Sequence, residues 1–359
     1  MARVLMVSEF YPPRIGGVER FVQELSQGLV ASGNQCTVLC TGDHDADETI
    51  LGVRVIRVRN WPVEFHGLNL RFASRLRGLL ESHDVVHINS FYPLLSNTAA
   101  HVCRRHGIPY VFSSHYHGQG HSRFGRVLYR LYLPFSRFIF ENAEAIHCCS
   151  RYEGSLVERD FGENLHIEVI PHGTSYDDLS PRERNGRLLF VGRMEEYKGP
   201  QRALAIIKEL KSRGRPRGLD LIGSGPMREE LEEEVRALGL DDLVSFRSGL
   251  PDDELLQMMR EASLLVLLSD AEAYGLVVSE ALSNGTPCLV SDRMALVEFE
   301  DEPGCFVHHG PYDVEVLADT VESILESDVS VGPFTDKIPS ISQMVSRLEG
   351  LFLSVMRPR

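Results

Sequence analysis

The sequence predicts an α/β protein with two doubly wound domains, each built around a mostly parallel sheet. Short apolar runs alternate with helical patterns along the whole chain, which is the order of elements in successive βαβ units. A polar, turn-rich stretch at 172–186 separates two such series and is the expected linker. The chain has 359 residues, which is long for one hydrophobic core, so size alone also favours two domains.

The first domain is expected over 1–171. Its strands are short apolar runs that are followed by polar or turn residues. They are expected at 3–8, 36–42, 53–58, 84–90, 109–115, 145–150 and 167–173. A helix is expected at 18–33, because apolar residues recur three and four positions apart and Gly33 supplies a stop signal.

The second domain is expected over 187–337, where the same alternation begins again. Its strands are expected at 187–193, 218–225, 243–249, 263–270 and 287–292. Helices are expected at 199–214 and 227–239. The tail has an amphipathic helical pattern, and we expect a terminal helix, about 338–359, to belong to the first domain.

Composition excludes several classes of protein. The net charge is −14, and residues 1–171 hold 17 Arg, no Lys and 17 acidic residues, so the second half carries the whole excess. A nucleic-acid partner is therefore not expected. The apolar runs are too short to span a bilayer or to form a signal-peptide core. Seven cysteines without a CxxC motif indicate a reduced, cytoplasmic protein without a zinc site.

Candidate binding residues follow the strands, because open parallel sheets bind ligands beyond the carboxyl ends of their strands. Gly16 and Gly17 follow the first strand and precede a helix, which would let an anion approach the backbone, although a flexible loop explains them equally well. Arg193 and Lys198 follow the first strand of the second domain. Together they could neutralise a diphosphate, and singly they read as solvated loop charges. Gly225 lies in another strand-to-helix turn, GSGP.

The stretch DAEAYGLVVSEALSNGTP at 270–287 holds two carboxylates without a local basic residue. A helix is expected to start near Gly275, so Glu272 and Glu280 would flank its positive end. Carboxylates in such a position can accept hydrogen bonds from ligand hydroxyls. The alternative is an exposed loop glutamate and a glutamate on a helix surface.

These fragments, in this order and spacing, resemble the retaining family 4 glycosyltransferases. The resemblance runs nearly end to end and includes GGVE (16–19), His115, VIPHG (169–173), LIGSGP (221–226) and a Glu-x7-Glu motif at 272–280. It implies the GT-B fold, with two Rossmann-like domains facing a central cleft. It also implies transfer of a sugar from a UDP- or GDP-linked donor to an acceptor hydroxyl, with retention of configuration and without a metal or other cofactor.

The resemblance also implies roles for individual residues. Glu272 would hold donor-sugar hydroxyls, and Glu280 would hold the ribose. Arg193 and Lys198 would bind the diphosphate and stabilise it as the leaving group, and His115 would lie near the reacting face of the sugar. The remaining substrate-binding positions would be Gly16, Gly17, Ala273, Tyr274, Gly275, Leu276 and Gly225.

Two segments depart from the pattern of this family. His172 stands where Asn is common, and Met294 and Ala295 stand where glycines are common. Glu298, which follows them, is therefore a weaker match to the family. Whether the loop at 291–298 contacts the donor base or phosphate is not predicted.

Three further segments have alternative interpretations. DHDAD at 43–47 resembles a metal-binding motif, but we prefer an acidic solvated loop. His117 and His121 lie near His115, and we expect a mobile loop rather than a metal site. Residues 123–140 interleave Arg with aromatic residues. They form either a core-facing helix or a surface that docks on anionic lipid at the cytoplasmic face and recruits a lipid-linked saccharide or phospholipid acceptor.

Two other functions fit the same architecture. A nucleotide-sugar epimerase can share the GT-B fold, and a catalytically silent GT-B subunit could bind a partner instead. The Glu-x7-Glu motif together with Arg193 and Lys198 favours a transferase.

Overall fold

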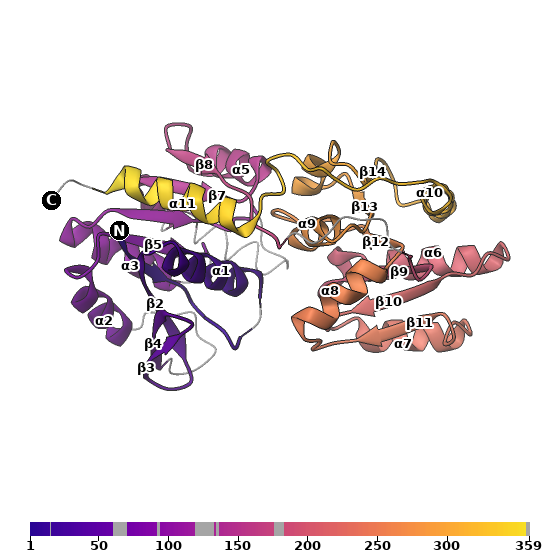
Figure 1. Cartoon of the computed structure of the whole chain (residues 1–359), viewed down its shortest axis with the longest axis horizontal. Helices are drawn as coiled ribbons and strands as arrows, with labels where there is room; N and C mark the ends of the chain where they lie inside the picture. Colours follow the sequence, from indigo (N-terminus) through magenta and orange to yellow (C-terminus); the bar gives the residue numbers. More distant parts are fainter. Residues whose placement is uncertain are drawn as a thin grey trace. The chain divides into compact units, whose positions relative to one another are not determined.

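The computed structural model describes residues 1–14, 16–59, 70–91, 94–118, 133, 136–175 and 183–356. The chain divides into two compact units (Figure 1). The first comprises Met1–Gly173 with Pro339–Arg359, and the second comprises Thr174–Ile338. The boundary lies at the start of the expected linker, and the C-terminal helix belongs to the first unit.

The first unit contains an eight-stranded sheet in the order β3-β4-β2-β1-β5-β6-β7-β8. Its strands are β1 (Arg3–Val7), β2 (Gln35–Gly42), β3 (Ala46–Ile50), β4 (Val53–Arg59), β5 (Val85–Asn89), β6 (Tyr110–Ser113), β7 (Ala145–Cys148) and β8 (Ile167–Val169). All neighbouring strands are parallel except β3 and β4. The sequence therefore placed seven of these strands, and β3 was not expected.

Helices cover both faces of this sheet. The helices are α1 (Gly17–Ala31), α2 (Leu70–Leu80), α3 (Leu94–His106), α5 (Arg151–Phe161) and α11 (Ile341–Val355). Alternate residues of β1 point to opposite faces. Val4 and Met6 pack with residues of α1 and α11, whereas Leu5 and Val7 pack with residues of α2, α3 and α5. Both faces are therefore buried, as the continuous apolar strands predict.

The acidic residues of the DHDAD segment (43–47) are exposed, as expected, but the segment is a loop only over 43–45. Its end belongs to β3, which pairs antiparallel with β4 at the edge of the sheet. Two aspartates of the segment, and Glu48 directly after it, form ion pairs with arginines. Asp47 pairs with Arg54 and Arg75, Asp45 pairs with Arg71, and Glu48 pairs with Arg57.

The second unit contains a six-stranded parallel sheet in the order β11-β10-β9-β12-β13-β14. Its strands are β9 (Arg187–Val191), β10 (Gly218–Ile222), β11 (Val244–Arg247), β12 (Leu264–Leu267), β13 (Cys288–Ser291) and β14 (Cys305–His308). Its helices are η1 (Glu196–Lys198), α6 (Pro200–Ser212), α7 (Arg228–Ala237), α8 (Asp252–Glu261), α9 (Leu276–Ser283), η2 (Met294–Phe299) and α10 (Val314–Glu326). The last strand, β14, was not expected from the sequence.

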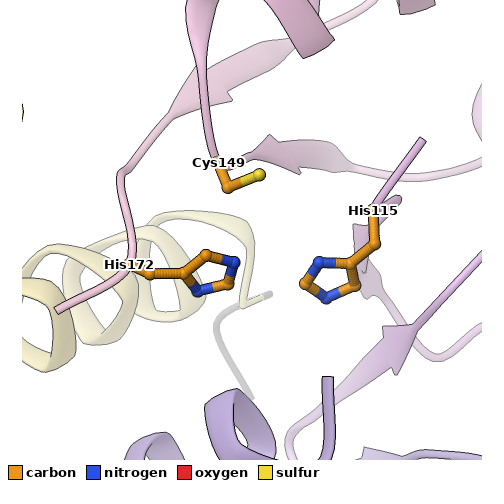
Figure 2. A group of neighbouring side chains, drawn as sticks. All are labelled: His115, Cys149 and His172. Atoms are coloured by element: carbon orange, nitrogen blue, oxygen red, sulfur yellow. The ribbon is translucent and has the colours of Figure 1, made fainter. Parts of the chain in front are cut away.

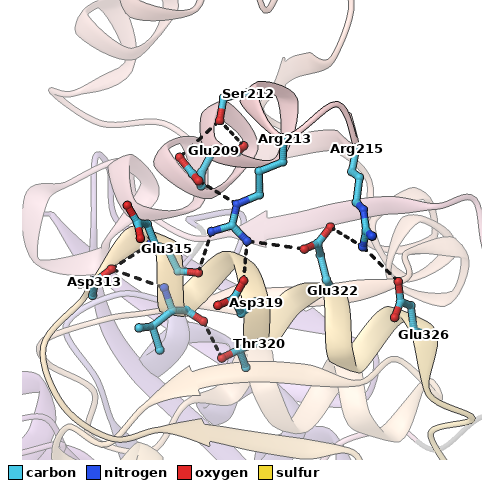
Figure 3. A network of polar contacts seen from close by, with 11 residues as sticks. Glu209, Ser212, Arg213, Arg215, Asp313, Glu315, Asp319, Thr320, Glu322 and Glu326 are labelled. Atoms are coloured by element: carbon cyan, nitrogen blue, oxygen red, sulfur yellow. Dashed lines mark hydrogen bonds and ion pairs between the residues drawn. The ribbon is translucent and has the colours of Figure 1, made fainter.

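A surface ion-pair network joins the end of α6 to α10 (Figure 3). The Arg213 guanidinium contacts Glu209, Asp319 and Glu322, and Arg215 contacts Glu322 and Glu326. These residues come from two helices that pack against each other. Arg213 and Glu322 are each shared by two or more partners, and such a network can stabilise the contact between the helices more than isolated exposed pairs do.

The described helices include none that is long and apolar enough to cross a membrane. Within 123–140 the structure describes residues 133 and 136–140; residues 136–140 are helical, and Ile139 and Phe140 are buried in the core of the first unit, which agrees with a core-facing helix there. The other residues of the segment lie outside the described part of the chain, and the lipid-docking interpretation is not tested.

Candidate active site

The predicted site residues of the second unit gather at the carboxyl ends of β9, β10 and β12. In this sheet β10 and β12 flank β9 on opposite sides. The order in which successive strands are added to the sheet therefore changes direction at β9. Such a switch point leaves a crevice between the connecting loops, and α/β proteins bind ligands in it. The loops after the three strands carry Arg193 and Lys198, Gly225, and Glu272, respectively.

The first two loops are held together by backbone contacts. The Met194 N–H donates to the Ser224 carbonyl at 2.8 Å, and the Met227 N–H donates to the Met194 carbonyl at 3.0 Å. Gly225 has φ +155°, and a Cβ there would lie 2.5 Å from the Met194 carbonyl oxygen. Only glycine fits that position, so the close approach of the two loops explains Gly225 without any ligand.

Lys198 and Glu272 form an ion pair across the site. The Lys198 Nζ lies 2.6 Å from Glu272 Oε1, and the side chains are only 17% and 14% exposed. Lys198 ends η1, and Gly199 follows at φ +78° as the cap of α6. A Cβ on Gly199 would overlap the Leu268 carbonyl at the end of β12. This close approach brings the Lys198 turn next to the loop that carries Glu272.

Tyr197 and Asp270 fasten these two loops further, and the sequence analysis did not single them out. The Asp270 N–H donates to the Tyr197 carbonyl at 2.7 Å. The Asp270 carboxylate accepts from Arg202 at 2.7 Å. Arg193 donates to the Tyr197 hydroxyl and pairs with Glu195 at 2.8 Å, but its side chain stays 62% exposed. Arg193 is therefore placed at the rim and is accessible to an anion.

Helix α9 begins where the sequence predicts, directly after Gly275. Gly275 has φ +103°, and a Cβ there would lie 2.7 Å from Cδ2 of Leu296. The first N–H groups of a helix have no intrahelical partner, and they carry partial positive charge. Glu280 lies in the second turn and is 7% exposed. Of the backbone set 273–276, Tyr274 and Gly275 are buried, and Ala273 and Leu276 are partly exposed.

The loop that departs from the family pattern packs against this region. The Ala295 N–H donates to the Glu272 carbonyl at 3.3 Å. Met294 has φ +51°, a left-handed conformation that glycine adopts without strain. The loop therefore has a backbone conformation that suits glycine, and Met294 adopts that conformation with strain.

The other three predicted residues lie in the first unit. Gly16 precedes α1 with φ −176°, an extended conformation that any residue adopts, and Gly17 is exposed, with open space where a Cβ would lie. Neither position has a backbone conformation that only glycine can adopt. His115 follows β6 with φ +47° and is 8% exposed. A non-glycine residue keeps such a strained backbone only where the contacts around it hold it there.

Glu153 holds the loop of His115 in place, although sequence reasoning missed it. Its Oε1 accepts from the Ser114 hydroxyl at 2.5 Å and from the Tyr116 N–H at 2.7 Å. Its Oε2 accepts from the N–H of Cys149 at 2.7 Å. Burial raises the pKa of Glu153 to about 7, and the hydrogen bonds from Cys149 and Ser114 oppose this rise. The Ser-x-x-Glu capping signature at 150–153 was the available signal.

A chain of buried polar side chains extends from this loop. His147 Nε2 lies 2.7 Å from the Ile170 carbonyl, so it must donate, and its Nδ1 then accepts from the Ser113 hydroxyl at 2.7 Å. His87 Nε2 in turn donates to Ser113 at 2.6 Å. Burial lowers the pKa of His147 to about 4, and it lowers the pKa of His87 well below its usual value. These imidazoles are therefore neutral at pH 7.

Family models match both units. The model for Glycosyltransferase Family 4 matches residues 15–178, and the model for Glycosyl transferases group 1 matches residues 176–336. A glycogen synthase of Mycobacterium tuberculosis is 31% identical over 360 residues, which cover 90% of this chain and 86% of that protein. The chain belongs to the family 4 glycosyltransferases.

Two further proteins are similar to this chain, one in sequence and one in fold. A GDP-mannose-dependent alpha-(1-6)-phosphatidylinositol monomannoside mannosyltransferase of Mycolicibacterium smegmatis is 27% identical over 79% of each chain. The Anabaena protein Alr3699/HepE, solved in complex with UDP and glucose, has a TM-score of 0.70 at 16% identity. That alignment covers 99% of this chain and 97% of that one. The fold of this glycosyltransferase is therefore GT-B, as the sequence resemblance implied.

Proposed function

We propose that this glycosyltransferase moves a sugar from a UDP- or GDP-linked donor to an acceptor hydroxyl, with retention of configuration and without a metal. The observation that carries the proposal is the Lys198–Glu272 pair beside the start of α9. Cation, carboxylate and helix N-terminus lie within one loop cluster. The cation and the helix N-terminus suit the phosphates of a nucleotide sugar, and the carboxylate suits the hydroxyls of its sugar.

Charge development explains why these groups would promote transfer. The sugar becomes oxocarbenium-like as its bond to the diphosphate breaks, and the leaving diphosphate gains negative charge. Lys198, Arg193 and the N–H groups at the start of α9 would stabilise that charge from fixed positions. Loss of one such donor typically lowers the rate by about 10²–10³-fold. Fixed cations of this kind also make a divalent ion unnecessary for the leaving group.

The carboxylates have separate proposed roles. Glu272 would exchange part of its contact with Lys198 for hydroxyls of the donor sugar when the diphosphate binds Lys198. Glu280, buried in α9, would accept hydrogen bonds from the ribose. His115, Gly16 and Gly17 keep the roles that the family resemblance implies for them.

Two relatives support the range of donors and acceptors. HepE was solved with UDP and glucose, and the mycobacterial mannosyltransferase is named for GDP-mannose and a phosphatidylinositol acceptor. We therefore propose a UDP- or GDP-sugar as donor and a saccharide or lipid-linked acceptor. The proposed site of action is the cytoplasm or the cytoplasmic face of a membrane.

A thermal-shift panel of UDP- and GDP-sugars in EDTA tests the proposal. A cognate donor at 100 times its Kd should raise the free energy of unfolding by about 2.7 kcal/mol. Transfer with retention should then follow in EDTA when an acceptor is supplied. A requirement for added metal would contradict the mechanism. Conversion of the donor without an acceptor would indicate an epimerase, and binding without turnover across acceptors would indicate a silent subunit.

A further inference from the structure

A second cluster of reactive side chains lies at the carboxyl ends of β6, β7 and β8 in the first unit. It consists of His115, Cys149 and His172, which are all buried. One nitrogen of each imidazole and the Cys149 Sγ lie within 4.8 Å of one another. Figure 2 shows the two rings facing each other, with the thiol beside the space between them. The three side chains come from segments more than 20 positions apart, so no short sequence motif reveals them.

The ligand chemistry of this cluster is selective. Two imidazoles and one thiol are the ligands that Zn²⁺ prefers, and hard cations such as Mg²⁺ prefer oxygen. In a tetrahedral site, bonds of about 2.0–2.3 Å place the ligand atoms roughly 3.5 Å apart. Ligand atoms within 4.8 Å of one another therefore need to approach by at most about 1.3 Å, through rotation of their side chains. Three protein ligands leave the fourth position open, as in metal sites that bind water or a small ligand.

Two of the three ligands are oriented by one carboxylate. Glu153 accepts from the Cys149 thiol at 2.9 Å and from the Cys149 N–H at 2.7 Å. The same carboxylate holds the residues before and after His115, which fixes that ring despite its left-handed backbone. An outer carboxylate of this kind also offsets the positive charge that a Zn²⁺–thiolate unit retains.

The third ligand is held by packing. The two imidazole rings are parallel within 3°, with centroids 5.6 Å apart. The Phe21 ring lies against both, 5.3 Å from His115 and 4.7 Å from His172. Gly173, which follows His172, lies so close to α11 that a Cβ would be 2.5 Å from the Ile341 Cα. His172 is therefore held near the other two ligands before any ion binds.

We propose that His115, Cys149 and His172 bind one Zn²⁺ ion, and that the bound ion inhibits sugar transfer. On coordination the S–H bond of Cys149 breaks, a zinc–sulfur bond forms and the proton is released. The inhibitory part rests on the proposed function, because it depends on His115 lying near the reacting sugar. A transferase that needs no metal for its leaving group can have a metal site whose occupancy switches it off.

Metal binding tests the site without any assay of activity. The metal-stripped full chain is titrated with CoCl₂, and the spectrum is followed for a thiolate-to-cobalt charge-transfer band at one ion per chain. ZnCl₂ should then abolish the band by displacement. We expect Cys149→Ser to lose the band and His172→Asn to weaken Zn²⁺ binding by at least about 10-fold. Cys36→Ser, which removes another buried cysteine of the first unit, should keep both.

Each outcome of this experiment decides the proposal. Absence of the band in the wild-type chain, or its persistence in Cys149→Ser, would overturn the site. If Cys149→Ser does not fold by circular dichroism, unchanged Zn²⁺ affinity in His172→Asn overturns it instead. Zn²⁺ binding that leaves transfer unaffected would overturn the inhibitory role. Absence of donor stabilisation with the cobalt band intact would refute the proposed function and leave the metal site standing.

Discussion

The Lys198 ammonium nitrogen lies 2.6 Å from Oε1 of Glu272, although 74 positions separate the two residues in the chain. The sequence showed a carboxylate without a neighbouring countercharge, and the fold supplies one through the contact between the ends of β9 and β12. The pair is mostly buried, so each charge depends on the other for compensation. A diphosphate that takes Lys198 would release Glu272 to accept hydrogen bonds from the sugar.

Removal of either partner should therefore reduce transfer. We expect Lys198→Met and Glu272→Gln each to lower kcat/KM by about 10²–10³-fold. The double variant should lose less than the product of the two effects, because the residues act on one ligand and on each other. Steady-state kinetics with a saturating acceptor measures this. Lys208→Ala, an exposed change on α6, is the control, and full activity in both single variants would refute the site.

Gly275 should be intolerant of any side chain. Its φ is +103°, and an added Cβ would approach Leu296 to 2.7 Å, so Gly275→Ala strains the start of α9. We expect a loss of at least about 1 kcal/mol in the free energy of unfolding, with weaker donor binding. Urea unfolding and the thermal-shift panel measure the two effects.

A second glycine provides the matched comparison for Gly275. Gly350 lies inside α11 and is exposed, and a Cβ added to it would meet no atom within 4 Å. Gly350→Ala should raise the free energy of unfolding by about 0.5–1 kcal/mol. Equal effects of the two substitutions would contradict the conformational explanation.

The sequence predicted the repeating architecture because buried parallel strands consist of contiguous apolar residues. The edge strand β3 was missed because Asp47 and Glu48 are polar and their partners, Arg54 and Arg57, lie on the neighbouring strand. Their positions after strands predicted Lys198 and Glu272 as site residues separately. Their ion pair could not be predicted, because it depends on how closely two loops approach.

The sequence signal at 150–153 points to a helix start, but it does not show that Glu153 supports the loop of His115. Glu153 reads as an ordinary first-turn glutamate of α5. Its buried partners Ser114, Tyr116 and Cys149 come from two other segments of the chain. Only the fold brings these groups to one carboxylate.

Replacement of Met294 by glycine should remove the strain of its left-handed backbone. A non-glycine residue in the left-handed region costs about 1–2 kcal/mol. Met294→Gly removes that strain at φ +51°, while the added flexibility of the unfolded chain offsets part of the gain. We expect a free energy of unfolding that is unchanged or higher by up to about 1 kcal/mol, measured in urea. A loss above about 1 kcal/mol would show that the Met294 side chain is needed for packing.

Residues 123–140 should bind anionic membranes if they recruit a lipid-linked acceptor. The interval from 85 to 140 contains no acidic residue, so its arginines would act together on an anionic surface. In flotation with vesicles, the chain should bind phosphatidylserine-containing liposomes and not pure phosphatidylcholine, and salt should weaken binding. Arg123→Glu with Arg130→Glu should reduce it. Equal binding to both vesicle types, or to neither, would exclude this role.

Acid should destabilise the first unit through its buried imidazoles. Burial lowers the pKa of His87 well below its usual value, and the nearby His147 adds to this effect. As pH falls below about 6.5, the unfolded chain binds a proton at this position before the folded chain does, so the free energy of unfolding falls. One such histidine contributes a slope of up to about 1.4 kcal/mol per pH unit. His87→Gln keeps a donor for Ser113 but cannot titrate. Between pH 6.5 and 5, in EDTA, the variant should therefore lose free energy of unfolding less steeply than the wild-type chain, and parallel curves would show that His87 titrates alike in both states.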